Sequence, residues 1–422
     1  TDGYFLSAQS ANAGGLTWAT VPAGYADADV NTHLNTGTAT TGEVLSWTGT
    51  DYDWIAAGGG SALELYAENP SSPTTPLVSG PNSVAVGSGS RAQSTNGSTA
   101  FGISAVATAN ASFAAGFQPQ ATGVGSLALG YTALAGSSFS TAVGYNAQTA
   151  TGSNATALTN SYASGTDSFA AAIANNTATY GATGANSVAI GRLAKATGAD
   201  SFAFGESSQA TAADAFALGR MVRSTSSYAV AMGYNCLSSA NYSVALGYNA
   251  TASGSNAFAA GASSTFVEKA TASGAGSVAL GGAYATANDS VSIGASSTTG
   301  ATIGKIAFSN DKFSANGDSQ HGLFVLRSDT TDATPEALTT SNTAAGTTNQ
   351  ITLPNSSAFA FHGTIVARQQ ASAGTASAAW KIEGLIRREA NAASTVLVNS
   401  ALTVLDNTPA WGLALSADTT NG

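Results

Sequence analysis

The chain is poor in charge, cysteine, histidine and proline, and each shortage excludes a class of protein. Only 9% of its 422 residues are charged, against roughly 25% in an ordinary soluble domain. One Cys cannot build a disulfide framework or a cysteine-based zinc site. Thirteen basic residues in a chain of net charge −10 do not form the clustered Lys and Arg of a nucleic-acid groove. Nine Pro exclude collagen, and no apolar run approaches the ~18 residues of a membrane-spanning helix.

What the chain has instead is a short repeat. An apolar-Ala-apolar-Gly motif recurs, in most cases every 14 residues. Examples are Leu127-Ala128-Leu129-Gly130, Val188-Ala189-Ile190-Gly191 and Val244-Ala245-Leu246-Gly247. Two copies keep the spacing but lose the Gly, at Leu158 and Ala172, and the Ala position fails at Thr156 and Ser292. Two insertions lengthen the step, before Gly191 and before Gly281. Such a period indicates stacked repeats.

Each unit has the chemistry of strands. In Val188-Ala189-Ile190 the large residues share one face and Ala takes the other. A second strand with small residues, such as Ala194 and Ala196, follows each Gly. Two strands and two turns per repeat predict a thin parallel β-solenoid of about fifteen 14-residue coils, roughly 70 Å long. The Gly suits one corner, and Asn186 and Asp200 suit the other.

The expected packing leads to an expected assembly. We expect each coil to bury its two large side chains, worth roughly 3–6 kcal/mol, whereas ordering 14 residues costs on the order of 20 kcal/mol. The Ala column then points outward as a flat face that another chain can approach closely. Because one slender roll gains so little, the sequence predicts lateral association, most simply as a homotrimer.

The repeat resembles the head of trimeric autotransporter adhesins of the YadA-like kind. Asn186-Ser187-Val188-Ala189-Ile190-Gly191, followed by Ala194 and Ala196, carries the likeness. The resemblance implies a left-handed parallel β-roll, all-β, with three chains around one axis in an elongated fibre used for attachment. We assign the roll to residues 81–304.

The N-terminal flank differs from the repeat. Residues 1–60 hold three of the five Trp, in segments such as Gly15-Leu16-Thr17-Trp18 and Glu43-Val44-Leu45-Ser46-Trp47, and Asp27 to Leu34 could form one or two helical turns. These small modules resemble those of bacteriophage tail fibres, cyanophages among them. A Pro-rich linker occupies residues 61–80.

The C-terminal flank regains charge and loses the 14-residue step. After a connector at 305–320, alternating runs such as Phe359 to Arg368 and Trp380 to Ile386 predict an antiparallel β-sandwich or jelly-roll at 321–422. This stretch resembles domains of phage structural proteins. The run Trp411 to Leu415 before Asn421-Gly422 predicts a strand and a hairpin turn whose return strand is missing, so we expect both ends of the chain to be cut.

The residues that could carry chemistry are scattered. His33, His321 and His362 lie in different segments, and Cys236 takes a small-residue slot of its coil, where we expect a buried structural thiol. Asp200 and Asp214 fall one coil apart, which leaves a polysaccharide-cleaving tailspike as the catalytic rival, but two turn-forming Asp are the preferred interpretation. We therefore expect no enzyme and assign no catalytic, cofactor-binding or metal-binding residue; the receptor-binding residues stay unknown.

The function expected from these features is attachment. The first hypothesis is a trimeric bacteriophage tail fibre, located in the virion tail, that contacts other tail proteins and binds a host surface polysaccharide or outer-membrane component. The alternative is the passenger of a bacterial trimeric autotransporter adhesin, and a third is a virion spacer without a receptor. Receptor contacts are expected in the insertion loops Ile173 to Asn186 and Ala262 to Gly276 and in the C-terminal domain.

Overall fold

The computed structural model describes most of the chain from residue 72 onward and four short strands before it. The described residues are 4–8, 16–20, 43–47, 52–56, 72–174, 178–262, 269–370 and 375–422. Within them the secondary structure is strand apart from one 3-10 turn, η2 at Ala392–Ser394. The all-β class predicted from the repeat is confirmed.

Two antiparallel hairpins lie in the N-terminal flank. β1 (Tyr4–Ala8) pairs with β2 (Leu16–Thr20), and β3 (Glu43–Trp47) pairs with β4 (Tyr52–Ala56). Their alternating Trp-containing sequences are typical of short hairpins. The helical turns expected at Asp27 to Leu34 lie outside the described residues.

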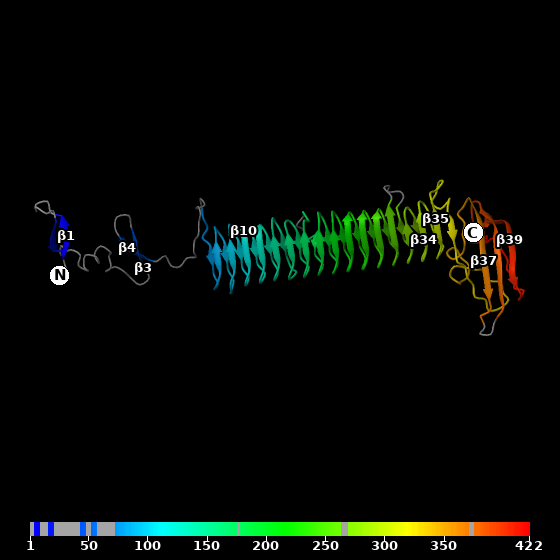
Figure 1. Ribbon diagram of the computed structural model, residues 1–422, viewed down its shortest axis with the longest axis horizontal. Coiled ribbons are helices and arrows are strands. Elements are labelled where there is room, and N and C mark those ends of the chain that lie inside the picture. The colour runs from blue at the N-terminus through cyan, green and yellow to red at the C-terminus, as the bar shows by residue number, and fades with distance from the viewer. Residues whose placement is uncertain are drawn as a thin grey trace.

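The repeats form a long parallel β-solenoid whose coils stack along one axis (Figure 1). Each coil contributes one strand to a first sheet and a shorter strand to a second sheet, and strand n pairs in register with its equivalent one coil on. The strands of the first sheet that run parallel are β6 (Val84–Val86), β8 (Thr99–Phe101), β10 (Phe113–Phe117), β12 (Leu127–Tyr131), β14 (Thr141–Val143), β16 (Thr156–Leu158), β18 (Phe169–Ala171), β20 (Val188–Ile190), β22 (Phe202–Phe204), β24 (Phe216–Arg220), β26 (Val230–Tyr234), β28 (Val244–Tyr248), β30 (Phe258–Ala262), β32 (Val278–Leu280), β34 (Val291–Gly294) and β35 (Ile306–Ser309).

The second sheet runs beside the first for fifteen strands. It begins at Leu77, so the ladder starts before the first repeat motif at Val84. Its strands are β5 (Leu77–Val78), β7 (Arg91–Ala92), β9 (Val106–Ala107), β11 (Gln120–Ala121), β13 (Leu134–Ala135), β15 (Gln148–Thr149), β17 (Tyr162–Ala163), β19 (Gly181–Ala182), β21 (Lys195–Ala196), β23 (Gln209–Ala210), β25 (Arg223–Ser224), β27 (Leu237–Ser238), β29 (Thr251–Ala252), β31 (Thr271–Ala272) and β33 (Tyr284–Ala285).

The interior of the solenoid is made mainly of Ala and Ser, with a few larger residues such as Val222, which reverses the expected packing. Ala189, Ala203 and their equivalents have no exposed surface, whereas the large residues on either side point outward. Buried Ser hydroxyls close the coil, as where Ser187 donates to the carbonyl of Gly184 at 2.7 Å. The prediction that the large side chains are buried and the Ala column exposed is therefore wrong. Two sheets joined by such short turns lie close together, so the position between the two outward residues of each first-sheet strand admits only Ala or Ser.

The two corners of each coil use the left-handed backbone conformations expected of them. Gly219 has φ of 131°, and a Cβ there would lie 1.9 Å from the carbonyl oxygen of Gly233 in the next coil, so no other residue fits. Asn186 and Asp200, at the opposite corner, have φ of 54° and 55°. These residue types tolerate that conformation better than most.

One coil is shifted relative to the interpretation of the repeat. Ala142 pairs with Ala157 rather than with Thr156, and Ala157 is buried, so the Ala column does not fail there. Thr159 then takes the corner that Leu158 was expected to take. Ser292 does replace Ala in its coil, where its hydroxyl lies 2.8 Å from that of Ser297.

After the last parallel strand the chain turns back on itself. β36 (His321–Leu323) pairs antiparallel with β35. Three long strands then form a separate antiparallel sheet in the order β37 (Ser357–Arg368), β38 (Ser377–Arg388) and β39 (Val396–Asn407). The predicted antiparallel pairing is confirmed. The second sheet that a sandwich or jelly-roll requires is not formed by the residues that the structure describes, and Trp411 to Leu415 is not a strand.

Candidate binding surface

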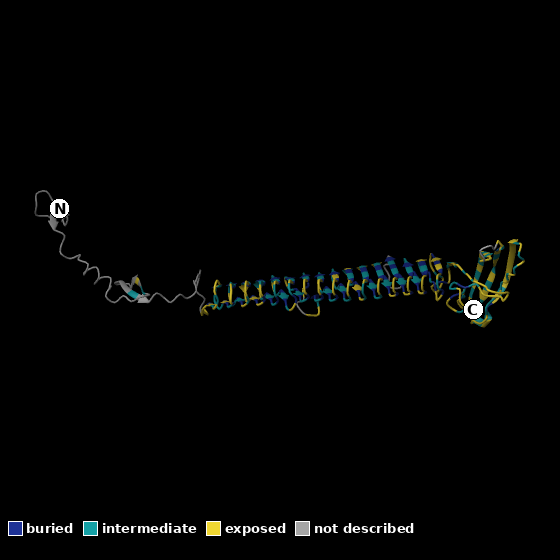
Figure 2. Ribbon diagram, turned by 90° about the horizontal axis from the view of Figure 1, so that it is seen from below, coloured by how far each residue is buried: buried dark blue, intermediate teal, exposed yellow. Residues whose placement is uncertain are grey.

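The outward side chains of the first sheet form a continuous apolar face along the solenoid. Two apolar or Thr side chains per coil project from strands β6 to β35, and several keep more than a third of their surface exposed: Val84 45%, Phe202 38%, Leu218 38% and Phe308 55%. The strands alternate between a buried Ala and partly exposed neighbours, and Figure 2 shows dark blue buried and teal intermediate segments following one another along the rod. We call this surface the apolar face. An apolar surface that runs along the whole solenoid is larger than the isolated apolar patches that soluble monomers leave in water.

Two columns of side chains border the apolar face. The entry flank is the column of residues two positions before each first-sheet strand, all with positive φ in the described coils, such as Asp200, Asp214 and Tyr228. The exit flank is the column two positions after the second outward apolar residue of each coil, such as Glu206, Arg220 and Tyr234. Because a strand separates the two columns, the flanks lie on opposite sides of the face.

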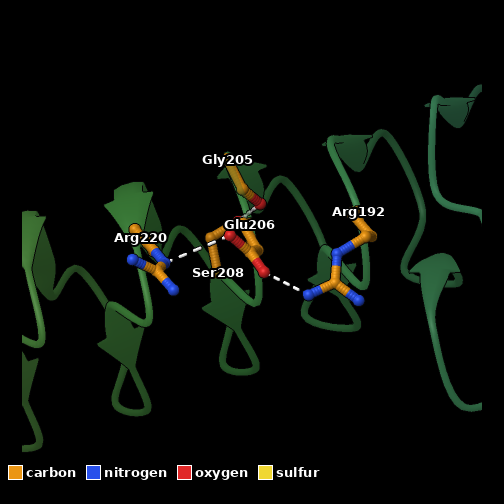
Figure 3. A network of polar contacts seen from close by, with 5 residues as sticks. All are labelled: Arg192, Gly205, Glu206, Ser208 and Arg220. Carbon is orange, nitrogen blue, oxygen red and sulfur yellow. Dashed lines mark hydrogen bonds and ion pairs between the residues drawn. The ribbon is translucent and has the colours of Figure 1, made fainter.

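The exit flank carries a row of alternating charges in the middle of the rod. Figure 3 shows Arg192, Glu206 and Arg220 on three successive coils, with Glu206 between the two guanidinium groups. Arg192 donates to Oε1 of Glu206, and Nε of Arg220 lies 3.1 Å from Oε2. The hydrogen bond and charge of Arg192, with Arg220 beside it, lower the pKa of the Glu206 carboxyl. Both Arg side chains stay more than half exposed.

Both flanks also carry stacked aromatic rings. On the exit flank the ring centroids of Phe117 and Tyr131 are 5.0 Å apart, those of Tyr131 and Tyr145 5.5 Å, and those of Tyr234 and Tyr248 4.9 Å. On the entry flank Tyr228 and Tyr242 stack at 4.9 Å. The stacking follows from the coil spacing, because identical positions in successive coils lie one strand separation apart. The rings cover one another's faces and turn their edges to the solvent.

The residues singled out in the sequence remain dispersed. Asp200 and Asp214 occupy equivalent exposed corners, and Asn186 donates to Asp200 at 2.9 Å, as expected of turn residues. His321 lies in β36 and His362 in β37, while His33 is outside the described residues. Among the described residues, no group of three or more His, Cys, Asp or Glu is placed to hold a metal ion. No described helix is long and apolar enough to cross a membrane.

The structure confirms the prediction for Cys236. Its thiol is 1% exposed and takes the interior slot that Ala147 and Ala250 take in other coils. Burial raises the pKa of this thiol, so it stays protonated and unreactive. The Cys236 side chain packs in the roll interior and cannot serve as a surface nucleophile.

One buried charge was missed by the sequence interpretation. Lys305 takes the interior Ser position of the last coil, with Nζ 5.7 Å from the centre of the Phe324 ring. Burial lowers the pKa of this amine to about 8. The only signal in the sequence was a Lys where Ser187 and Ser201 stand in other coils.

The expected receptor loops are only partly described. Residues 175–177 and 263–268 lie outside the described residues, and so does the side chain of Ala262. Ile173, at the start of the first loop, is fully buried and belongs to the roll interior. The flanks, in contrast, were not predicted as surfaces. The position after each corner Gly shows the composition of the exit flank at a 14-residue step, and the corner position before each strand shows that of the entry flank.

The geometry of the repeats agrees with a comparison against known families. The family described as YadA head domain repeat (2 copies) matches residues 79–97, 121–147, 182–205, 196–220, 238–264 and 268–282. The chain contains YadA head domain repeats. All six segments lie in the solenoid, and together they cover less than half of the chain. No curated protein matches the chain. The YadA head repeats thus favour the adhesin alternative over the phage tail fibre.

Proposed function

We propose that this chain is part of the head of a homotrimeric adhesin, an extracellular fibre that attaches its carrier to another surface. The single observation that carries the proposal is the apolar face on YadA head repeats. A lone solenoid would leave this face in water along its whole length, at a cost of roughly 25 cal/mol per Å². Three copies around one axis bury it and leave the second sheet, whose outward residues are a mixture of polar and apolar ones, outside.

The role is binding without catalysis. Asp200 and Asp214 are exposed corner residues in contact with water, whereas a catalytic carboxylate pair works best where water is excluded from the substrate. We favour a glycan as the ligand class, because the roll has no charged residue from Ala92 to Thr166 or from Ser224 to Val267. Such a neutral hydroxyl- and amide-rich surface suits neutral sugars.

The test combines assembly with attachment. The purified chain should have the native mass of three copies and should bind candidate host cells in a pull-down, whereas a monomeric chain would refute the proposal. A trimer that binds no cell and no sugar on a glycan array would leave a spacer role and would also refute it. Hydrolysis of a bound polysaccharide would show an enzyme instead.

A second candidate is the tail fibre of a bacteriophage, located in the virion. The Trp-containing hairpins β1–β2 and β3–β4 favour it, since they lie outside the matched repeats. The two candidates differ in what the DNA next to this coding segment should encode. A membrane anchor encoded after residue 422 would support the adhesin, and genes for other tail proteins beside this one would support the fibre.

A further inference from the structure

We propose that the entry flank of each chain packs against the exit flank of a second copy within the same coil, and that matched side chains on the two flanks fix the axial register of the assembly. This inference rests on the homotrimer proposed above and adds to it the contacts between neighbouring copies. It starts from the apolar face and the two columns beside it.

Symmetry brings opposite flanks together. When three copies turn the same face toward a common axis, the left side of each copy meets the right side of the next, which is a heterologous contact that closes into a ring. A rotation without translation leaves every coil at the same height in all three copies. The entry flank of a coil therefore faces the exit flank of the same coil in the neighbour.

The aromatic residues of the two flanks match coil by coil. The entry flank has three aromatic residues in the described coils, Phe139, Tyr228 and Tyr242, and all are more than half exposed. Each belongs to a coil whose exit flank is also aromatic, the pairs being Phe139 with Tyr145, Tyr228 with Tyr234 and Tyr242 with Tyr248. Within one chain a strand separates the members of each pair. Inside a single solenoid the Tyr residues stack along their own flank instead, Tyr228 on Tyr242 and Tyr234 on Tyr248.

One pair of charges matches as well. Asp214 on the entry flank belongs to the same coil as Arg220 on the exit flank, and both are exposed. Arg220 already contacts Glu206, but with Arg192 on the other side the row has more positive than negative charge. The entry flank of these coils supplies Asp200 and Asp214. Asp200 shares its coil with Glu206, whose charge is offset by Arg192 and Arg220 of its own chain, so the favourable charge match in this register is that of Asp214 with Arg220.

These matches specify the axial register between copies, which the repeated apolar pattern alone does not. A face with the same apolar pattern in every coil could pair equally well after a shift by one or more coils, as repetitive strands do. A shift would set Tyr228 or Tyr242 against small or charged residues and would separate Asp214 from Arg220. Unlike residues at a few positions therefore specify one register, as polar positions do in coiled coils.

Cysteine pairs test the contact. In a Cys236→Ala background, Tyr242→Cys and Tyr248→Cys are combined in one chain and treated with a short bis-maleimide. We expect covalent trimers on a denaturing gel, because each entry-flank Cys meets an exit-flank Cys of the neighbour. Each single substitution should leave the chain uncrosslinked. Circular dichroism and native mass verify that every variant keeps its strands and its assembly.

A displaced pair is the matched control. Phe139→Cys combined with Tyr248→Cys uses the same two flanks but places the thiols in different coils, β14 and β28, and should not crosslink. If the native mass shows trimers but the matched pair fails, or the displaced pair links equally well, the register proposal is overturned and the homotrimer stands. If the unmodified chain is monomeric, both proposals fall together.

Discussion

The corner glycines offer the sharpest test of how the coils stack. Gly233 has φ of 117°, and a Cβ built on it would lie 1.9 Å from the carbonyl oxygen of Gly247 in the next coil. Ordinary contact begins at 3.4 Å, so Gly233→Ala forces two paired strands, β26 and β28, apart. The perturbation is a single methyl group at a corner.

Two costs add in this substitution. Holding a non-Gly residue in that backbone region costs on the order of 1–3 kcal/mol. Moving the carbonyl of Gly247 aside weakens the ladder hydrogen bonds at this boundary, each worth about 1 kcal/mol. We therefore expect a loss of roughly 2–4 kcal/mol per chain, concentrated between two coils because each repeat contacts only its neighbours.

The assay compares urea unfolding of Gly233→Ala with that of Gly412→Ala. Gly412 has no positive φ and no atom within 4 Å of its ideal Cβ, so its substitution should shift the midpoint little. Hydrogen exchange should speed up at β26 and β28 more than at distant coils. Equal midpoints for the two variants would refute the corner argument.

Three further predictions follow from other positions. Burial lowers the pKa of Lys305 to about 8 from an ordinary 10.5, so between these pH values the unfolded chain binds more protons than the folded chain. The free energy of unfolding should therefore rise from pH 8 to 10.5. Lys305→Met should remove that rise and should raise the unfolding midpoint at pH 7. Leu246→Asp on the apolar face should convert trimers to monomers in native mass spectrometry, whereas Leu237→Asp on the second sheet should not; trimers in both would contradict the assembly. The thiol of Cys236 should react with Ellman's reagent only in denaturant, and rapid reaction of the native protein would show that the roll interior is open.

The period of the sequence predicted the stacking of coils but not which side faced in. Ala, Gly and the Asn or Asp corners recur at fixed steps because each has one backbone or packing requirement. The structure places the Gly and the Asn or Asp corners as expected, whereas the Ala column, expected on the outside, is buried. The orientation was wrong because hydrophobicity was weighed without volume. Thr99, Phe113 and Leu127 share one outward column, and such a range of sizes fits an open surface, whereas the neighbouring position stays Ala because the interior has one size.

The surface features were harder to predict for a physical reason. The flanks join residues that are six apart in the sequence but act together only between copies, so no single-chain pattern selects them. The C-terminal strands were visible from their alternation, yet alternation does not tell one sheet from two. The strand β39 is exposed on both faces along most of its length, which a sandwich would not allow.

The direction of the ladder has a consequence for a fibre under load. The hydrogen bonds between coils run along the rod, so tension on its ends pulls on every boundary in series, and the boundary with the least strand pairing fails first. Among the described residues, that boundary lies near the first insertion, where β17 and β19 share the single residue pair Ala163 and Ala182 and β16 and β18 share two pairs. Drag on an attached carrier would therefore open the rod near its middle, sparing both ends.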